Sequence, residues 1–200
     1  MEFFIRREMS VLFIFSFILW LFLFREFLLG RRALINDALP YYEHFKFFID
    51  NIRRGIIPLW ESTRDGGVPA EFFLRRIGEF NPFYSFILIL NLAGISYQHS
   101  YLFFLAGYYF LGLLGFYLLT RLLFENRALA FLSFLLLMFS SLGTLLFCSF
   151  IILEFVPMVY FFYFLTAFLR APQKPSFLGA CFCLMILLST YIPLYFLTIL

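Results

Sequence analysis

The sequence predicts an all-α polytopic membrane protein with about five or six transmembrane helices and a large first extracytoplasmic loop that carries interfacial helices. Of the 200 residues, 64% are hydrophobic and only 14% are charged, and the mean hydropathy is +0.94. The 34 phenylalanines add more apolar surface than a chain of this length can bury inside a water-soluble globule. Composition therefore excludes a soluble domain, and the gathering of charged residues in one stretch locates the loop.

Charge and cysteine content exclude several classes of partner and site. The net charge of +3 is too small for a nucleic-acid-binding surface, so no nucleic-acid partner is expected. Cys148, Cys181 and Cys183 all lie in apolar runs, and the last two point in different directions on a helix. His44 and His99 are distant from each other and from the cysteines. Neither a disulfide framework, nor a metal site, nor a cofactor is predicted.

Residues 1–29 are predicted to form a cytoplasmic N-terminus and the first transmembrane helix. The apolar run over 9–29 is long enough to cross a hydrocarbon layer of about 30 Å. A cleaved signal peptide is the alternative, because Arg6 and Arg7 precede the run. No small-residue cleavage site follows it, which favours an uncleaved anchor. Arg25 and Glu26 near its far end can reach toward water.

Residues 30–82 are predicted to form the extracytoplasmic loop, since eight of the 15 basic and seven of the 12 acidic residues fall there. An amphipathic helix is expected early in the loop and along the membrane surface, with Asn36 or Asp37 as its N-cap and Gly55 as its stop. His44 is expected to be exposed on it. One stripe of this helix is apolar, and consists of Tyr41, Tyr42, Phe45, Phe48, Ile49 and Ile52.

The loop continues with an extended segment over 57–60 and a tight turn over 65–69. Trp60 with Glu61 could stack against a sugar ring and bind its hydroxyls, but a headgroup-level anchor is the favoured interpretation of Trp60. The glycines after Asp65 could admit a phosphate to the backbone N–H groups. A plain turn explains them as well.

Residues 83–200 are predicted to form a transmembrane bundle from apolar blocks at 83–92, 101–119, 128–147, 150–169 and from 176 onward. Block 83–92 is too short to span a bilayer and is expected not to cross. Six basic residues in short loops or chain ends then share the cytoplasmic side: Arg6, Arg7, Arg121, Arg127, Arg170 and Lys174. Because the last block is still apolar at Leu200, the chain is expected to be truncated within a span.

The loop also carries a set of short motifs in a fixed order. An Asp follows the first span, an aromatic residue lies one helical turn on, and Gly, Pro-Leu-Trp, Gly-Gly-x-Pro and Asn-Pro-Phe come after it. These residues are Asp37, Tyr41, Gly55, Pro58, Leu59, Trp60, Gly66, Gly67, Pro69, Asn81, Pro82 and Phe83. Over about a quarter of the chain, this pattern resembles the first extracytoplasmic loop of the GT-C membrane glycosyltransferases, most closely the bacterial YfhO-type membrane proteins.

The resemblance implies transfer of a sugar from a polyprenyl-phosphate-linked donor to an acceptor on the outer face of a bacterial cell membrane. Asp37 matches the family's catalytic Asp and would act as general base on the acceptor hydroxyl. The developing charge on the lipid phosphate calls for a guanidinium group. Candidates are Arg53, Arg54, Arg64, Arg75 and Arg76, and the predicted substrate-binding residues are Tyr41, Trp60, Glu61, Arg64, Asp65 and Glu154.

Two acidic residues have alternative roles. Asp37 is flanked by Asn36 and Ala38, not by a second acidic residue, so the mechanism is expected to be metal-independent. Residue type alone favours an N-cap role for Asp37 over a catalytic one, and the resemblance reverses that order. Glu154 lies in an apolar block three residues before Pro157. It could assist Asp37, pair with a loop arginine, or simply reach toward water at a helix end.

A non-catalytic polytopic transporter or lipid-handling protein is the second functional hypothesis. Transporters usually carry ionisable residues or broken helices near the midplane, often in two related halves. Here Glu154 is the only clear case and no internal repeat is visible, which favours the transferase. The resemblance also implies a donor pocket built from more spans than 200 residues supply, so the activity is expected of the full-length protein.

Overall fold

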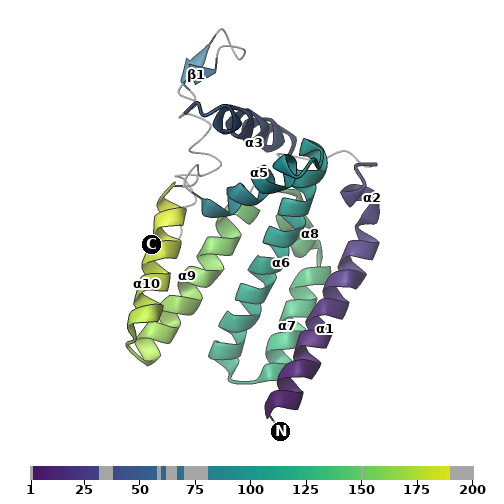
Figure 1. Cartoon of the computed structure of the whole chain (residues 1–200). Coiled ribbons are helices and arrows are strands. Elements are labelled where there is room, and N and C mark those ends of the chain that lie inside the picture. Colours follow the sequence, from purple (N-terminus) through teal and green to yellow (C-terminus); the bar gives the residue numbers. More distant parts are fainter. Residues whose placement is uncertain are drawn as a thin grey trace.

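The computed structural model describes residues 2–31, 38–57, 60–61, 67–69, 81–149 and 151–189. This part is helical except for two two-residue strands, β1 (Trp60–Glu61) and β2 (Val68–Pro69), which pair antiparallel with Trp60 opposite Pro69. The predicted helical class is confirmed. The helices are α1 (Glu2–Leu23), α2 (Arg25–Leu28), α3 (Ala38–Arg53), η1 (Pro82–Tyr84), α5 (Ser85–Leu92), α6 (Tyr97–Phe124), α7 (Arg127–Phe139), α8 (Ser141–Cys148), α9 (Ile152–Arg170) and α10 (Lys174–Ser189) (Figure 1).

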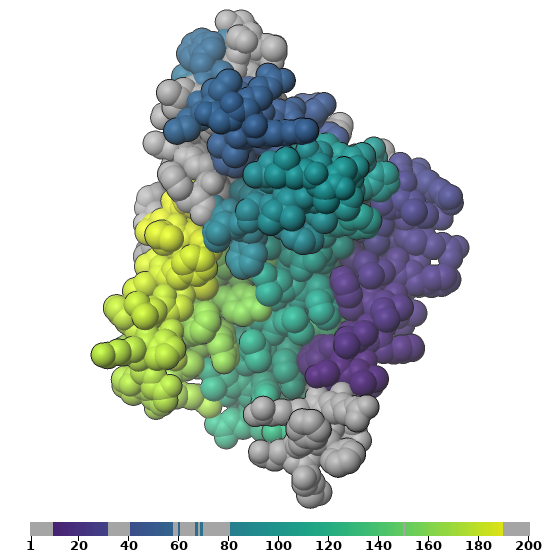
Figure 2. Space-filling view, viewed as in Figure 1, coloured from purple at the N-terminus to yellow at the C-terminus, as the bar shows by residue number. Residues whose placement is uncertain are grey.

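The long helices form a bundle with two distinct ends. One end carries α3, α5 and the two strands, and we call it the loop end (Figure 1). At the other, which we call the turn end, α6 turns into α7, α9 turns into α10, and α1 begins (Figure 1). α1 and α10 lie at opposite edges of the bundle in this view (Figure 2).

Two helices, α6 and α9, are long and apolar enough to cross a membrane, and α7 with α8 makes a third if this bent pair is one span. The other apolar helices of the described part are shorter: Ser10–Leu23 of α1, Pro82–Leu92 and α10. Large apolar side chains face outward, including Phe15 at 63% exposure and Leu136 at 64%. So much outward apolar surface suits lipid as the surrounding solvent.

α6 is the central helix and packs against α5, α7, α8 and α9. Its glycines allow α9 to approach closely: a Cβ at Gly112 would lie 2.8 Å from Phe155, and one at Gly115 would lie 2.8 Å from Tyr160. The Tyr160 hydroxyl donates a hydrogen bond of 3.1 Å to the Leu111 carbonyl. Where lipid replaces water, such close van der Waals packing and hydrogen bonding hold helices together.

α1 is attached to the bundle by aromatic side chains. Trp20 is 1% exposed, stacks on Phe24 at 4.6 Å between centroids, and meets Phe147 of α8 edge-on at 4.9 Å. On the other side of α1, Ile14 and Ile18 are exposed. The helix ends at Leu23, and the charged pair Arg25 and Glu26 begins the separate short helix α2.

The sequence block 128–147 is not one straight helix, because α7 and α8 meet at 61°. Ser140 stands at the bend: its Oγ donates to the Leu137 carbonyl at 2.9 Å and accepts from the Gly143 N–H at 3.0 Å. Tyr109 of α6 donates to the Met138 carbonyl at 3.3 Å. These hydrogen bonds satisfy backbone groups at the bend. Such groups would find no hydrogen-bond partner in hydrocarbon.

α3 is the amphipathic helix expected in the loop. It ends where predicted, with Gly55 in the left-handed region at φ +71°, a conformation that favours glycine. Its apolar stripe packs on protein: Phe45 is 0% exposed and lies edge-on to Tyr84 at 4.6 Å. The expectation of an exposed His44 was wrong, since His44 is 3% exposed and meets Tyr41, one helical turn earlier, at 5.8 Å between centroids.

α5 lies at the loop end and spans only a short distance. Its eight residues extend about 12 Å, well under a bilayer's hydrocarbon thickness. Asn91 near its end accepts a hydrogen bond of 3.1 Å from Arg53 of α3. Asn81, just before η1, bonds to Tyr108, which lies less than halfway along α6 from the loop end. Both ends of η1 and α5 therefore stay beside the loop-end half of α6.

Candidate functional site

The predicted site residues fall partly outside the described part of the chain. Asp37, Arg64 and Asp65 lie outside the described residues, and so does the side chain of Glu61, whose backbone belongs to β1. Among the candidate phosphate-binding arginines, Arg75 and Arg76 also lie outside them. Tyr41, Trp60 and Glu154 are described.

Tyr41 is buried between α3 and the bundle. The side chain is 8% exposed, and Phe45, one turn further along α3, packs against Tyr101 of α6 at 5.4 Å between centroids. Tyr41 therefore helps to dock α3, and its face of the helix is turned toward α6. Arg53 and Arg54 end the same helix at exposed positions.

Trp60 lies in a different place from Tyr41. It is 57% exposed on β1, which lies on the far side of α3 from the bundle (Figure 1). Its ring covers Gly67, because a Cβ at Gly67 would meet the Trp60 ring at 2.7 Å. The tight turn predicted over 65–69 was wrong at its end, because Val68 and Pro69 form β2; residues 65 and 66 lie outside the described residues.

Glu154 lies in the first turn of α9 and is 8% exposed. Within the described part of the chain, its Oε1 has no hydrogen-bond partner and its carboxyl forms no ion pair. A buried carboxyl group without a partner is costly. The structure thus brings neither Trp60 nor Glu154 together with Tyr41 in a single cluster of described residues.

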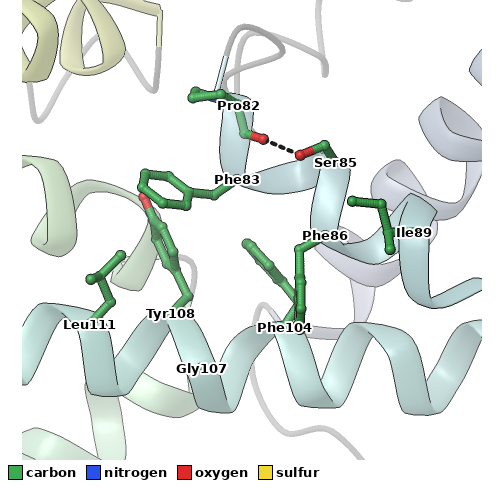
Figure 3. Close-up of a pocket in the computed structure, with 9 residues that line it drawn as sticks. All are labelled: Pro82, Phe83, Ser85, Phe86, Ile89, Phe104, Gly107, Tyr108 and Leu111. Carbon is green, nitrogen blue, oxygen red and sulfur yellow. Dashed lines mark hydrogen bonds between the residues drawn. The ribbon is translucent and has the colours of Figure 1, made fainter.

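One feature that could hold a ligand is an apolar groove beside α6, made of two adjoining hollows. The α5 hollow, of about 450 Å³, lies between α6 and the segment η1–α5 (Figure 3), and is lined by Pro82, Phe83, Ser85, Phe86, Ile89, Phe104, Gly107, Tyr108 and Leu111. The α10 hollow, of about 320 Å³, reaches α9 and α10, and is lined by Phe83, Tyr108, Leu111, Val156, Pro157, Tyr160, Phe164, Gly179, Phe182, Cys183 and Ile186. The two hollows share Phe83, Tyr108 and Leu111, so together they form the groove.

A hydrogen bond between Asn81 and Tyr108 fixes the wall that the two hollows share. The Asn81 side-chain amide donates to the Tyr108 hydroxyl at 2.9 Å, and the Asn81 side-chain oxygen accepts from the Phe83 N–H at 3.1 Å. Asn81 is 2% exposed and Tyr108 is 3% exposed. The sequence Asn-Pro-Phe explains the local shape, since Asn caps η1 and Pro occupies its first position.

The rim of the α5 hollow carries one further polar group. The Ser85 hydroxyl donates to the Pro82 carbonyl at 2.6 Å, as the dashed line in Figure 3 marks. The rings of Phe83 and Tyr108 lie next to each other on one side of the hollow (Figure 3), with their centroids 5.6 Å apart. The groove is thus hydrophobic and aromatic with a few hydroxyl and amide groups, a lining typical of a site for a hydrocarbon ligand.

Tyr84 adjoins this wall and remains neutral. Burial raises the pKa of its phenol well above the ordinary value of 10, the neighbouring Tyr108 phenol adds to the rise, and the Asn81 side chain partly opposes it. On α3, burial and the nearby Asp50 carboxylate raise the pKa of Tyr42. Both hydroxyls therefore act as neutral hydrogen-bonding groups at the loop end.

The described part of the chain contains no group of three or more His, Cys, Asp or Glu side chains that could hold a metal ion. The lining of the groove contains no carboxylate and no imidazole. The groove can therefore bind apolar ligands, while acid–base chemistry would have to come from other residues. Comparison of the chain with known protein families, with curated proteins and with solved structures finds no match.

Reasoning from the sequence did not identify Gly107, Tyr108 and Leu111 as lining residues. They lie within an apolar block in which no polar residue distinguishes one face from another. Asn81-Pro82-Phe83 was singled out, but only as a motif at the entry to the next block. The pairing of Asn81 with Tyr108 joins residues 27 apart in sequence, and no local pattern reports such a contact.

We predict that Asn81→Leu lowers the free energy of unfolding by about 1–3 kcal/mol, because the Tyr108 hydroxyl then stays buried without its donor. Thermal unfolding in detergent of Asn81→Leu, Tyr108→Phe and the double variant measures the effect. The double variant should cost less than the sum of the two single variants. Additive losses would show that the two side chains do not interact.

Proposed function

We propose that the chain is a multi-pass integral membrane protein of the bacterial inner membrane. Its crossings would be α1, α6, the bent pair α7–α8, α9 and α10, with η1–α5 remaining on one side. The outward apolar surface and the spans available in α6 and α9 support this arrangement. The turn end, where Arg121, Arg127, Arg170 and Lys174 lie, would face the cytoplasm by the excess of basic residues in cytoplasmic loops.

We infer that its activity is transfer of a sugar from a polyprenyl-phosphate-linked donor to an acceptor on the extracytoplasmic face. The observation that carries this proposal is the apolar groove, which lies beside α6 and under the segment η1–α5 at the loop end. A groove of this chemistry would hold part of an isoprenoid chain. The donor's phosphate would then lie toward the loop, the most charged part of the sequence.

In this proposal the chemistry belongs to the loop. Asp37, directly before α3 in the sequence, would take the proton from the acceptor hydroxyl as it attacks the sugar. One of the loop arginines would stabilise the charge that develops on the departing lipid phosphate. Arg53 is the least available of them, because its guanidinium already donates to Asn91. The resemblance of the loop motifs to GT-C enzymes supports these roles.

A non-catalytic lipid-handling protein is the second candidate function. One observation favours it: the described lining of the groove binds hydrocarbon but offers no carboxylate or imidazole. A protein that only holds or moves a lipid needs no more than this. The two candidates therefore differ in whether Asp37 is required.

Topology is the first property to test. In a variant whose native cysteines are replaced by serine, Lys46→Cys and Asn91→Cys should be labelled by an impermeant maleimide from the outside of intact cells. Gln173→Cys at the turn end should be labelled only after permeabilisation. Labelling of residues 46 and 91 from opposite sides would contradict the proposal that α5 does not cross.

For catalysis, we predict that Asp37→Asn in the full-length protein lowers kcat for sugar transfer by about 10²–10⁴-fold, the usual contribution of a general base. Asn caps a helix about as well as Asp, so thermal stability should not change. Glu43→Gln, an exposed acid on α3, is the matched control and should keep full activity. Undiminished turnover by Asp37→Asn would remove Asp37 from the mechanism and favour the lipid-handling alternative.

For the groove, we predict that Gly107→Leu raises KM for the long-chain donor by about tenfold to a hundredfold, since the new side chain displaces about four buried carbons of the ligand. A Cβ at Gly107 meets nothing within 4 Å, so the fold should accept the change. Ala128→Leu, at an exposed position of α7, adds a side chain outside the groove and should have no effect. Equal KM values for the two variants would mean that the groove does not bind the donor.

A further inference from the structure

Four basic side chains gather on the two turns of the turn end. Arg121 and Arg127 flank the α6–α7 turn, while Arg170 and Lys174 flank the α9–α10 turn. We call these four residues the turn-end patch. Glu125 is the one acidic residue in the two turns. The patch is therefore strongly basic, and it lies at the opposite end of the bundle from the groove's η1–α5 wall (Figure 1).

The two turns are tied into one surface. The Arg170 guanidinium donates to the Glu125 carboxylate at 2.8 Å, although the two residues are 45 apart in sequence. In the described part of the chain, Arg121, Arg127 and Lys174 form no ion pair. The only acid of the two turns is thus occupied by Arg170, and three cations remain for an outside partner.

Favourable interaction with a helix dipole explains the positions of only two of the four residues in the patch. Arg121 and Arg170 lie in the last turns of α6 and α9, where a cation is favoured by the helix dipole. Arg127 and Lys174 instead begin α7 and α10, where the dipole disfavours a cation. Asn126 already caps α7 by accepting from the N–H groups of Ala128 and Leu129. The helix dipole therefore does not account for the positions of Arg127 and Lys174.

Exposed apolar side chains border the patch on the bundle side. Leu129 is 49% exposed in the first turn of α7, Leu169 is 73% exposed just before the other turn, and Leu178 is 65% exposed one turn into α10. A border of this kind places the cations at the level of lipid headgroups, with the apolar side chains among the acyl chains. A soluble protein or a nucleic acid would not match the apolar border.

We propose that the turn-end patch binds anionic phospholipid headgroups in preference to zwitterionic ones. Lipid phosphates without a compensating choline or ethanolamine would provide negatively charged partners for Arg121, Arg127 and Lys174. The attraction is of the kind that basic segments next to a membrane show toward anionic leaflets. This inference rests on the chain lying in a bilayer, as proposed above, and is independent of sugar transfer and of the groove.

The test compares the association of spin-labelled phosphatidylglycerol and phosphatidylcholine with the protein in vesicles at low salt. The wild-type chain should prefer phosphatidylglycerol. Addition of 0.5 M salt should weaken this preference, because salt screens the attraction between exposed charges. Arg127→Gln with Lys174→Gln should reduce the preference by about fivefold for each cation removed. The charge-preserving pair Arg127→Lys with Lys174→Arg should retain it.

Arg31→Gln with Lys46→Gln is the matched control, because it removes two exposed cations at the loop end. This pair should leave the preference unchanged. The proposal is overturned if the wild type shows no preference, if the turn-end pair behaves like the wild type, or if the loop-end pair reduces the preference equally. A protein that shows no sugar transfer should still show the lipid preference, so the two proposals can fail separately.

Discussion

The buried hydrogen bond between Asn81 and Tyr108 is the contact on which the candidate site depends. It joins the segment that enters the bundle after the loop to the central helix, at a depth where water is not available to replace it. By holding η1 against α6, it positions Phe83 between the two hollows of the groove. The short helix α5 can then lie beside α6, and the loop end acquires an apolar groove.

Other contacts in the bundle also involve the central helix α6. Glycines on α6 admit the rings of α9, aromatic side chains attach α1, and Tyr109 and Ser140 donate to backbone carbonyls at the bend between α7 and α8. The two proposed binding sites would be separated along this axis. The groove and the loop lie toward one end of α6, and a basic surface with an apolar border lies at the other.

Local chemistry in the sequence predicted most helix positions, because Gly55, Pro82 and the charged residues near 125 and 171 interrupt the apolar runs. The bend at Ser140 was not predictable in the same way, since no proline marks it and the supporting contact comes from Tyr109 on another helix. The burial of His44 likewise depends on tertiary packing around α3, which the pattern of a single helix does not reveal. Of the predicted site, Tyr41 and Glu154 proved buried and Trp60 exposed, whereas the groove arises from long-range contacts that periodicity cannot report.

The bend between α7 and α8 has a consequence for which sequences can adopt this fold. A Cβ at Gly143 would lie 2.5 Å from the Tyr109 hydroxyl and would also meet the Leu137 carbonyl. Any larger residue at 143 would have to displace both groups, and with them the hydrogen bond from Tyr109 to Met138. Positions 109 and 143 are therefore expected to change together in evolution, because a larger residue at 143 leaves no room for the tyrosine hydroxyl.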